Sequence, residues 1–193
     1  MKLYRENQIK GKNKVNKKVL VLSSSPRRGG NSDLLCDQFV NGSTEAGNLT
    51  EKILLKDKKI NYCTGCGTCI DRGKKCSQKD DMAEVLDKMV EADVIVMATP
   101  VYFYTMCGQM KTLIDRTCSR YTEITNKDFY FIVTAADDSK PAMERTLEEF
   151  RAFTNCLDGA NEKGIVYGTG AWNMGDIKGK PAMKHAYEMG KQV

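Results

Sequence analysis

The stretch VLVLSSSPRRGGNS, residues 19–32, joins an expected strand to an expected helix and decides the fold. Its first part, 19–22, is an unbroken apolar run with the length and β-branched content of a strand buried on both faces of a parallel sheet. Asn31 or Ser32 can cap the helix that follows, whose apolar residues at 34, 35, 39 and 40 have helical spacing. A polar loop of eight residues lies between the two elements.

That loop has the chemistry of a phosphate site. A helix N-terminus offers unpaired backbone N–H groups and a partial positive charge, to which Arg27 and Arg28 add full charge. Gly29 and Gly30 allow the backbone a tight turn close to a ligand. An ordinary polar turn would also fit, and neither the P-loop motif nor the G-x-G-x-x-G dinucleotide motif is present. The loop therefore favours the phosphate of a mononucleotide.

Further along the chain, apolar runs alternate with amphipathic segments. Strands are expected at 49–55, 94–98, 129–133 and 165–167, the run at 94–98 ending before Pro100. Helices are expected from Asp80 or Asp81 to about 90, and at 105–118, 141–153 and 181–190. This alternation predicts an α/β fold, a doubly wound five-stranded parallel sheet with helices on both faces. Ligands then bind beyond the strand ends, at residues 23–32, 99–105 and 134–139.

Length and charge predict one domain with a basic leader. The 193 residues carry a net charge of +5, yet residues 1–18 hold seven Lys or Arg against one Glu, which leaves the rest at −1. We expect residues 1–18 to be a solvated leader and 19–193 to be the globular domain. The sequence has no signal peptide and no run of about 20 apolar residues, so no membrane or nucleic-acid partner is expected. The expected location is the cytoplasm.

A second expected loop carries aromatic rings at the same edge of the sheet. It reads Pro100, Val101, Tyr102, Phe103 and Tyr104, and its rings are suited to flank a flat heterocycle. Capping of the core or a subunit contact would also use such rings. Together with the phosphate loop on a neighbouring strand, they favour a flavin mononucleotide. Trp172, in a Gly-flanked loop, packs internally or contacts a partner subunit.

The order of motifs resembles a known family over residues 19–190. Ser-Pro-Arg…Gly-Asn-Ser, Cys-x-x-Cys-x-x-Cys…Cys…Asp-Asp-Met and Thr-Pro-Val-Tyr-Phe…Gly-Gln-Met-Lys…Ile-Asp-Arg resemble the NAD(P)H-dependent FMN reductases and, more closely, the iron-sulfur flavoproteins of the flavodoxin-like superfamily. The resemblance implies that the FMN phosphate is held by Ser23, Ser25, Arg27, Asn31 and Ser32. It also implies that the flavin ring lies against residues 100–104, with Thr134 and Ala135 on its other side. The chain departs from the family at Ser24, commonly Gly, and at Cys107, where Ser is expected.

Four cysteines, Cys63, Cys66, Cys69 and Cys76, have the spacing C-x2-C-x2-C-x6-C. Four thiolates so spaced suit a [4Fe–4S] cluster, and they would also suit zinc. The C-x-x-C pairs could instead form a dithiol redox centre, and the loop could also be empty or prone to form a disulfide. We expect the other four, Cys36, Cys107, Cys118 and Cys156, to be buried small hydrophobes.

Two functions follow from this reading. The first is an FMN-dependent oxidoreductase in which NAD(P)H reduces the flavin and a small flavin or quinone-type molecule accepts the electrons. No catalytic acid or base is assigned, because hydride transfer to a flavin needs none. The second is an electron carrier that passes electrons between a [4Fe–4S] cluster and FMN for a ferredoxin-like partner. The resemblance also implies a homodimer or homotetramer.

Overall fold

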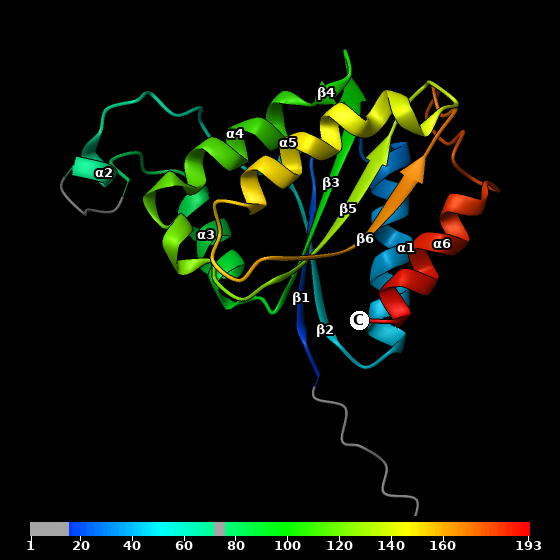
Figure 1. Cartoon of the computed structure of the whole chain (residues 1–193), viewed down its shortest axis with the longest axis horizontal. Helices are drawn as coiled ribbons and strands as arrows, with labels where there is room; N and C mark the ends of the chain where they lie inside the picture. The colour runs from blue at the N-terminus through cyan, green and yellow to red at the C-terminus, as the bar shows by residue number, and fades with distance from the viewer. Residues whose placement is uncertain (1–15, 72–75) are drawn as a thin grey trace, which may run out of the picture.

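The computed structural model describes residues 16–71 and 76–193, so residues 1–15 of the expected leader lie outside the described part (Figure 1). Its strands are β1 (Lys18–Ser23), β2 (Leu49–Leu54), β3 (Val94–Tyr102), β4 (Thr105–Met106), β5 (Asp128–Thr134) and β6 (Asn161–Gly168). Its helices are α1 (Asn31–Glu45), α2 (Thr68–Asp71), α3 (Met82–Glu91), α4 (Gly108–Arg116), α5 (Glu144–Thr154) and α6 (Pro181–Lys191). Short 3₁₀ turns are η1 (Leu55–Asp57), η2 (Thr117–Ser119), η3 (Tyr121–Glu123) and η4 (Lys140–Met143).

The sheet has the order β2-β1-β3-β5-β6, and all of these strands are parallel. The expected count of five is wrong by one strand, because the two residues of β4 pair antiparallel with the end of β3. After β1 the chain goes to β2 on one side, and after β2 it crosses to β3 on the other. The order therefore reverses between β1 and β3, which is where a doubly wound sheet opens a crevice.

Strand β3 is longer than expected and passes through Pro100. Its pairing with β1 stops at Ala98, opposite Ser23, whereas its pairing with β5 continues to Pro100, opposite Thr134. Between Ala98 and the pairing with β4, which begins at Val101, β3 has a neighbouring strand on one side only, so a residue without an N–H is tolerated at Pro100. The strand thus carries Val101 and Tyr102 beyond the edge of β1.

Three helix starts differ from expectation. The N-cap of α1 is Gly30, in extended conformation, because the Asn31 side chain is bonded elsewhere. The helix expected from Thr105 begins at Gly108, because Thr105 and Met106 form β4. The segment from Pro141 starts as 3₁₀ and becomes α5 only at Glu144. In the described part of the chain, no helix combines the length and apolar character required to cross a membrane.

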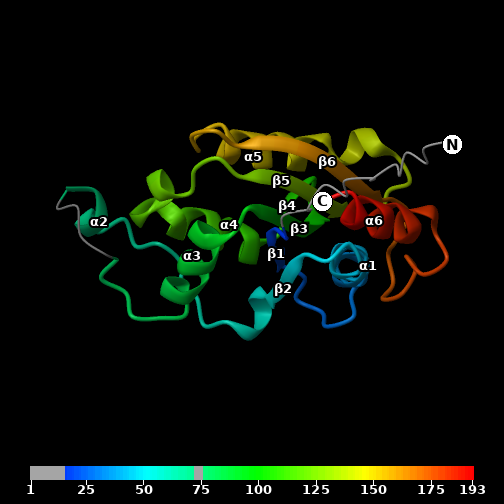
Figure 2. The same ribbon diagram turned by 90° about the horizontal axis from the view of Figure 1, so that it is seen from below.

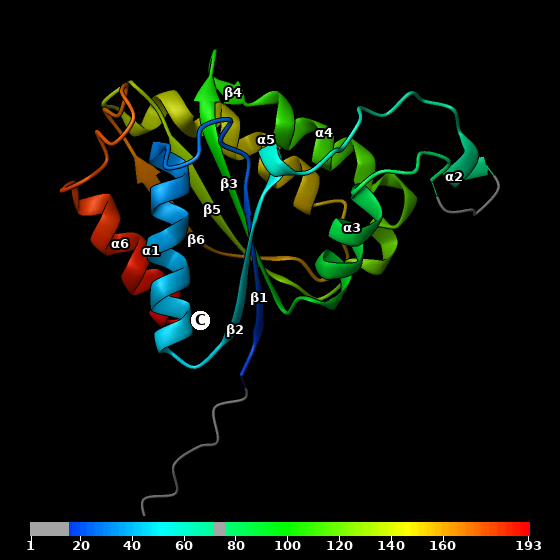
Figure 3. The same ribbon diagram turned by 180° about the vertical axis from the view of Figure 1, so that it is seen from behind.

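Alternate residues along the strands supply two cores. Leu20 and Leu22 belong to a core with α3, α4 and α5, whereas Val19 and Val21 belong to one with α1 and α6. Figures 2 and 3 show α1 and α6 together, well separated from α3 and α4. Helices α1 and α6 approach closely at a glycine: a Cβ on Gly190 would lie 2.2 Å from the Phe39 carbonyl oxygen. Both layers leave the carboxyl ends of the strands open.

Candidate functional site

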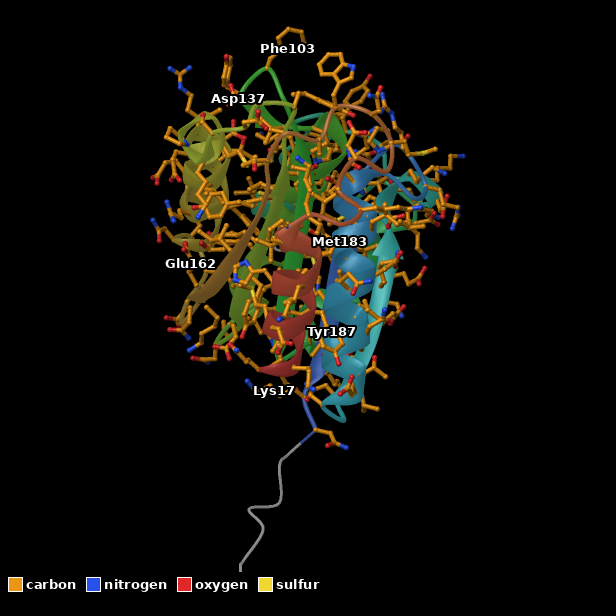
Figure 4. All side chains as sticks on the ribbon, turned by 90° about the vertical axis from the view of Figure 1, so that its right-hand side faces the viewer. Lys17, Phe103, Asp137, Glu162, Met183 and Tyr187 are labelled. Carbon is orange, nitrogen blue, oxygen red and sulfur yellow. The ribbon has the colours of Figure 1, made fainter. Side chains whose placement is uncertain are left out.

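A cavity of about 350 Å³ opens at the carboxyl edge of the sheet, between the loops that follow β1, β3, β5 and β6. Ten of the twelve residues predicted from the sequence to bind a cofactor line it: Ser25, Arg27, Asn31, Ser32, Pro100, Val101, Tyr102, Phe103, Thr134 and Ala135. Ser23 and Tyr104 do not. Gly30, Ala136, Ala171 and Trp172 line it in addition. In Figure 4, Phe103 and Asp137 mark this end of the molecule.

One end of the cavity has donors without acceptors. Ser32 is 1 % exposed, and its Oγ has no hydrogen-bond partner among residues 16–71 and 76–193. It lies in the first turn of the 15-residue helix α1, where backbone N–H groups also lack intrahelical partners. Arg27 lines the same end, and within the described chain its guanidinium makes no hydrogen bond or ion pair. An orphaned hydroxyl, a helix N-terminus and a free cation fit the phosphate of FMN.

The turn that carries these donors is held by a buried carboxylate. Asp33 is 2 % exposed and accepts hydrogen bonds from the Ser23 hydroxyl at 3.2 Å, the Gly29 N–H at 2.8 Å and the Lys52 ammonium at 2.9 Å. Ser23 is therefore directed at Asp33 and not into the cavity, which corrects its predicted role. Burial lowers the pKa of Lys52, but its hydrogen bonds to Asp37 and Asp33 outweigh burial and raise that pKa above its usual value. The ammonium thus balances the Asp33 charge.

Arg28, by contrast, points away from this end, because its guanidinium pairs with Asp57. Gly30 keeps the turn tight: a Cβ there would lie 2.6 Å from the Ser25 Oγ and 3.0 Å from the Arg27 carbonyl oxygen. The Ser25 hydroxyl in turn donates to that carbonyl at 2.9 Å and accepts from the Arg27 N–H at 3.2 Å. The turn is thus closed by its own hydrogen bonds without filling the cavity.

Asn31 connects this turn to the loop after β6. Its amide nitrogen donates to the carbonyl oxygens of Ala171 and Asn173 at 3.1 and 2.8 Å. Its amide oxygen accepts from the N–H groups of Gly175 and Ile177 at 3.0 and 3.3 Å. The side chain is fully used inside the protein, so only its backbone N–H is available to a ligand. This clamp brings Ala171 and Trp172 to the cavity, a contact that no sequence motif indicates.

The opposite wall is a strained hairpin. Tyr102 pairs with Thr105, and the two residues between them, Phe103 and Tyr104, have positive φ of 51° and 65°. Tyr104 turns toward α5, where its carbonyl accepts from the Thr146 hydroxyl at 3.2 Å and its ring faces Arg145 at 6.0 Å. Its predicted place against the flavin ring is therefore not where the side chain lies.

The two departures from the family pattern contact each other beneath the cavity. The Ser24 hydroxyl donates to the Ala98 carbonyl at 2.7 Å, and the Cys107 thiol lies 3.1 Å from the same hydroxyl. The Cys107 N–H donates to the Thr99 hydroxyl at 3.0 Å. All of these groups are buried. The two residues thus tie the ends of β1 and β3 to the start of α4, and neither of them lines the cavity.

The described part of the cysteine loop, with α2, lies beyond α3 and α4, away from the carboxyl ends of the strands (Figures 1 and 3). Arg116 contacts residues at both ends of this loop. The guanidinium donates to both Asp80 carboxylate oxygens at 2.7 and 2.9 Å and to the Asn61 carbonyl at 2.6 Å. It also approaches the Cys76 Sγ at 3.6 Å. The Arg116 and Asp80 side chains are 2 % and 1 % exposed. Hydrogen bonds from Arg116 hold the pKa of Asp80 down at about 2.

The four motif cysteines are not gathered around one point. No group of three or more His, Cys, Asp or Glu within residues 16–71 and 76–193 is arranged to hold a metal ion. Hydrogen bonds to Thr68 and Ser77 lower the pKa of Cys66 to about 6. Burial, followed by the neighbouring Cys69 and Cys63 thiols, raises the pKa of Cys118. As it stands, the loop does not fit a cluster.

The remaining cysteines divide into two kinds. Cys36 and Cys107 are buried, as expected, and burial raises the pKa of Cys36. Cys156 is exposed and Cys118 half-buried, so the expectation for these two is wrong. The reason is that α4 and α5 end at Arg116 and Thr154, before either cysteine, and each falls in the turn that follows its helix.

Comparison with known proteins shows which family the chain is similar to. The model of the NADPH-dependent FMN reductase family matches residues 17–162. An iron-sulfur flavoprotein of Archaeoglobus fulgidus is 35 % identical over 181 residues, which cover 91 % of this chain and 78 % of that protein. One from Methanocaldococcus jannaschii is 46 % identical over 100 residues, about half of each chain (52 % and 51 %). An azoreductase structure from Bacillus anthracis superimposes with a TM-score of 0.72 at 17 % identity, covering 92 % of this chain and all of that one, which shows a common fold.

Proposed function

We propose, from the premise that this chain belongs to the NADPH-dependent FMN reductase family, that FMN binds in the cavity at the carboxyl edge of the sheet and that a small flavin or quinone-type molecule accepts its electrons. The chain is an oxidoreductase that works with FMN and NAD(P)H. The observation that carries the proposal is the orphaned Ser32 hydroxyl at the N-terminus of α1.

The residues divide into two tasks. Ser32, Arg27 and the first N–H groups of α1 bind the phosphate, and Asp33 holds their turn in place. Pro100, Val101 and Tyr102 offer a flat apolar wall for the ring, and Thr134 and Ala135 close the other side. When bound, FMN supplies the hydride and electron chemistry. No side chain of the site has to move a proton for hydride transfer.

Binding and reduction are tested separately. Purified protein is titrated with FMN while flavin fluorescence is recorded, and the loaded protein is then mixed anaerobically with NADH or NADPH in a stopped-flow instrument. We expect saturable binding, followed by loss of the oxidised flavin absorbance with at least one nucleotide. Protein that binds no FMN, or loaded protein that neither nucleotide bleaches, would contradict the proposal.

A second candidate, electron transfer between FMN and an iron-sulfur cluster in the cysteine loop, is favoured by one feature. Arg116 brings Asn61 and Cys76 to one point, so both ends of the loop are fixed. Because the described cysteines are not gathered, holding a cluster requires the loop between these ends to rearrange. Iron and sulfide analysis of anaerobically purified protein decides it: about four of each per chain supports the carrier, and none excludes it.

A further inference from the structure

Two exposed aromatic rings stand at the mouth of the cavity with no intramolecular packing to explain them. Phe103 is 98 % exposed and Trp172 is 76 % exposed, and both line the cavity. We propose that these two rings form the binding site for the second reactant, a planar aromatic electron acceptor stacked at the mouth. This proposal rests on the proposed function, because it places the acceptor next to a bound flavin.

The size of the cavity supports the separation of two ligands. A volume of about 350 Å³ lies at the lower end of the range for small-molecule sites, so one flavin and its phosphate tail suffice to occupy it. A second reactant must then bind at the opening. A planar ring there gains stacking contacts with Phe103 and Trp172 that a non-planar molecule of equal charge cannot make.

The backbone at Phe103 indicates that the ring is held out at a cost. A two-residue hairpin with both φ values positive normally uses Asn and Gly, whereas here it uses Phe103 and Tyr104. Non-glycine residues in this conformation store strain, and such strain gathers at binding sites. The hairpin is also anchored, because the Met106 N–H donates to the Glu149 carboxylate on α5 at 2.9 Å. The backbone that carries Phe103 is therefore held in place.

Trp172 is positioned with equal firmness from the other loop. The Asn31 amide bonds the carbonyl oxygens of Ala171 and Asn173, the residues on either side of Trp172. The peptide on each side of the tryptophan is thus fixed to the start of α1, while the indole itself stays open to solvent. In both loops the backbone is already ordered when a ligand arrives, so only the side-chain rotamers are restricted on binding, which lowers the entropy cost.

The test uses oxidised, FMN-loaded protein and two sulfonates. Anthraquinone-2-sulfonate carries a planar ring system, cyclohexanesulfonate carries none, and neither exchanges electrons with oxidised flavin. Binding is measured by calorimetry for wild type, Phe103→Gly and Trp172→Leu. We expect the anthraquinone Kd to rise about three- to tenfold in each variant, the range of one lost aromatic contact, with no resolvable binding of cyclohexanesulfonate.

Controls separate this proposal from folding and from flavin binding. Phe103→Gly should melt no lower than wild type, because glycine accepts a φ of 51° and the ring packs against nothing. Asn126→Gly replaces another residue with a positive φ, of 56°, at the opposite ends of the strands, and it should leave the anthraquinone Kd unchanged. FMN is titrated first for every variant.

Three results would overturn the proposal. An unchanged anthraquinone Kd in both ring variants, with FMN retained, would overturn it and leave the proposed function standing. Loss of FMN in parallel with loss of the quinone would assign the rings to the flavin instead. A change of oligomeric state in Phe103→Gly with unchanged quinone binding would show that the ring contacts a second copy of the chain. Wild-type protein that takes up no FMN would contradict the proposed function itself.

Discussion

Replacement of Ser32 by alanine should make the flavin-free protein more stable and should lower its affinity for FMN. The Ser32 hydroxyl is buried without a partner, and burial of an unpaired hydroxyl costs about 1–3 kcal/mol in protein mutational data. Removal of that hydroxyl relieves the cost and leaves a void of only one atom. We expect Ser32→Ala to raise the free energy of unfolding of the flavin-free protein by roughly 1 kcal/mol.

When FMN is present, the wild type should be more stable than Ser32→Ala. A hydrogen bond to a charged group is worth about 1.5–3 kcal/mol, so its loss raises the Kd roughly 10- to 100-fold. Ligand that binds only the folded state adds about 2.7 kcal/mol of stability at a hundred times its Kd. At a fixed FMN concentration of about a hundred times the wild-type Kd, FMN therefore raises the free energy of unfolding of the wild type more than that of the variant. The two denaturation curves should therefore exchange places when FMN is added.

The assay is chemical denaturation with and without FMN, followed by circular dichroism, and a flavin fluorescence titration for the Kd. Ser43→Ala is the matched control: Ser43 is a buried serine on the same helix, but its hydroxyl bonds the Thr50 hydroxyl at 2.8 Å. It should destabilise by about 1 kcal/mol with FMN affinity unchanged. A Ser32→Ala protein that is less stable without flavin and binds FMN as tightly as wild type would refute the phosphate assignment.

Arg116→Ala should destabilise by about 3–5 kcal/mol in urea titration, because it leaves the buried Asp80 carboxylate unpaired. The pKa of Asp80 is about 2 in the folded state against 3.8 in the unfolded state. The ion pair therefore contributes fully to the free energy of unfolding above about pH 4, and roughly 2 kcal/mol of this contribution is lost as the pH falls to 2. In Arg116→Ala this pH-dependent loss of stability should disappear. Asn31→Ala removes four hydrogen bonds to residues 171–177. It should therefore lower the melting temperature and raise the FMN Kd. If this loop resists proteases as well in the variant as in the wild type, Asn31 does not hold it in place.

Sequence patterns were sufficient where local and global preferences agree. The run at 19–22 and the run at 94–98 have no polar alternation, so burial on both faces followed directly, and both became central strands. The ends of elements did not follow in the same way. Pro100 was expected to stop β3, but whether a proline fits depends on which neighbouring strand reaches it, and that is set by the length of β1. The two residues of β4 are too few for any periodicity.

The site was predictable as a set of loops but not as a set of roles. Asn31 was identified as a phosphate ligand, yet its amide is used to hold residues 171–177, which are distant in sequence. Ser23 and Ser32 are the same residue type in the same loop region, so the sequence does not distinguish them. In the structure the Ser23 hydroxyl donates to Asp33, whereas the Ser32 hydroxyl has no hydrogen-bond partner in the described chain. Trp172 carries no motif, and its place at the mouth results from contacts of its loop with Asn31 and with Ala135, which are both distant in sequence. Roles of this kind depend on long-range partners.

Asp33 poses an apparent contradiction, since a buried carboxylate beside an expected phosphate site should repel the ligand. Two features resolve it. Lys52 donates to both Asp33 and Asp37, so the Asp33 charge is paired on the side away from the cavity. Asp33 also accepts the Gly29 N–H, which fixes the glycine turn before any ligand arrives. A preformed turn spares the ligand the cost of ordering it, and the net attraction then comes from Arg27 and the α1 N-terminus. The carboxylate thus acts on the loop and the cation acts on the phosphate.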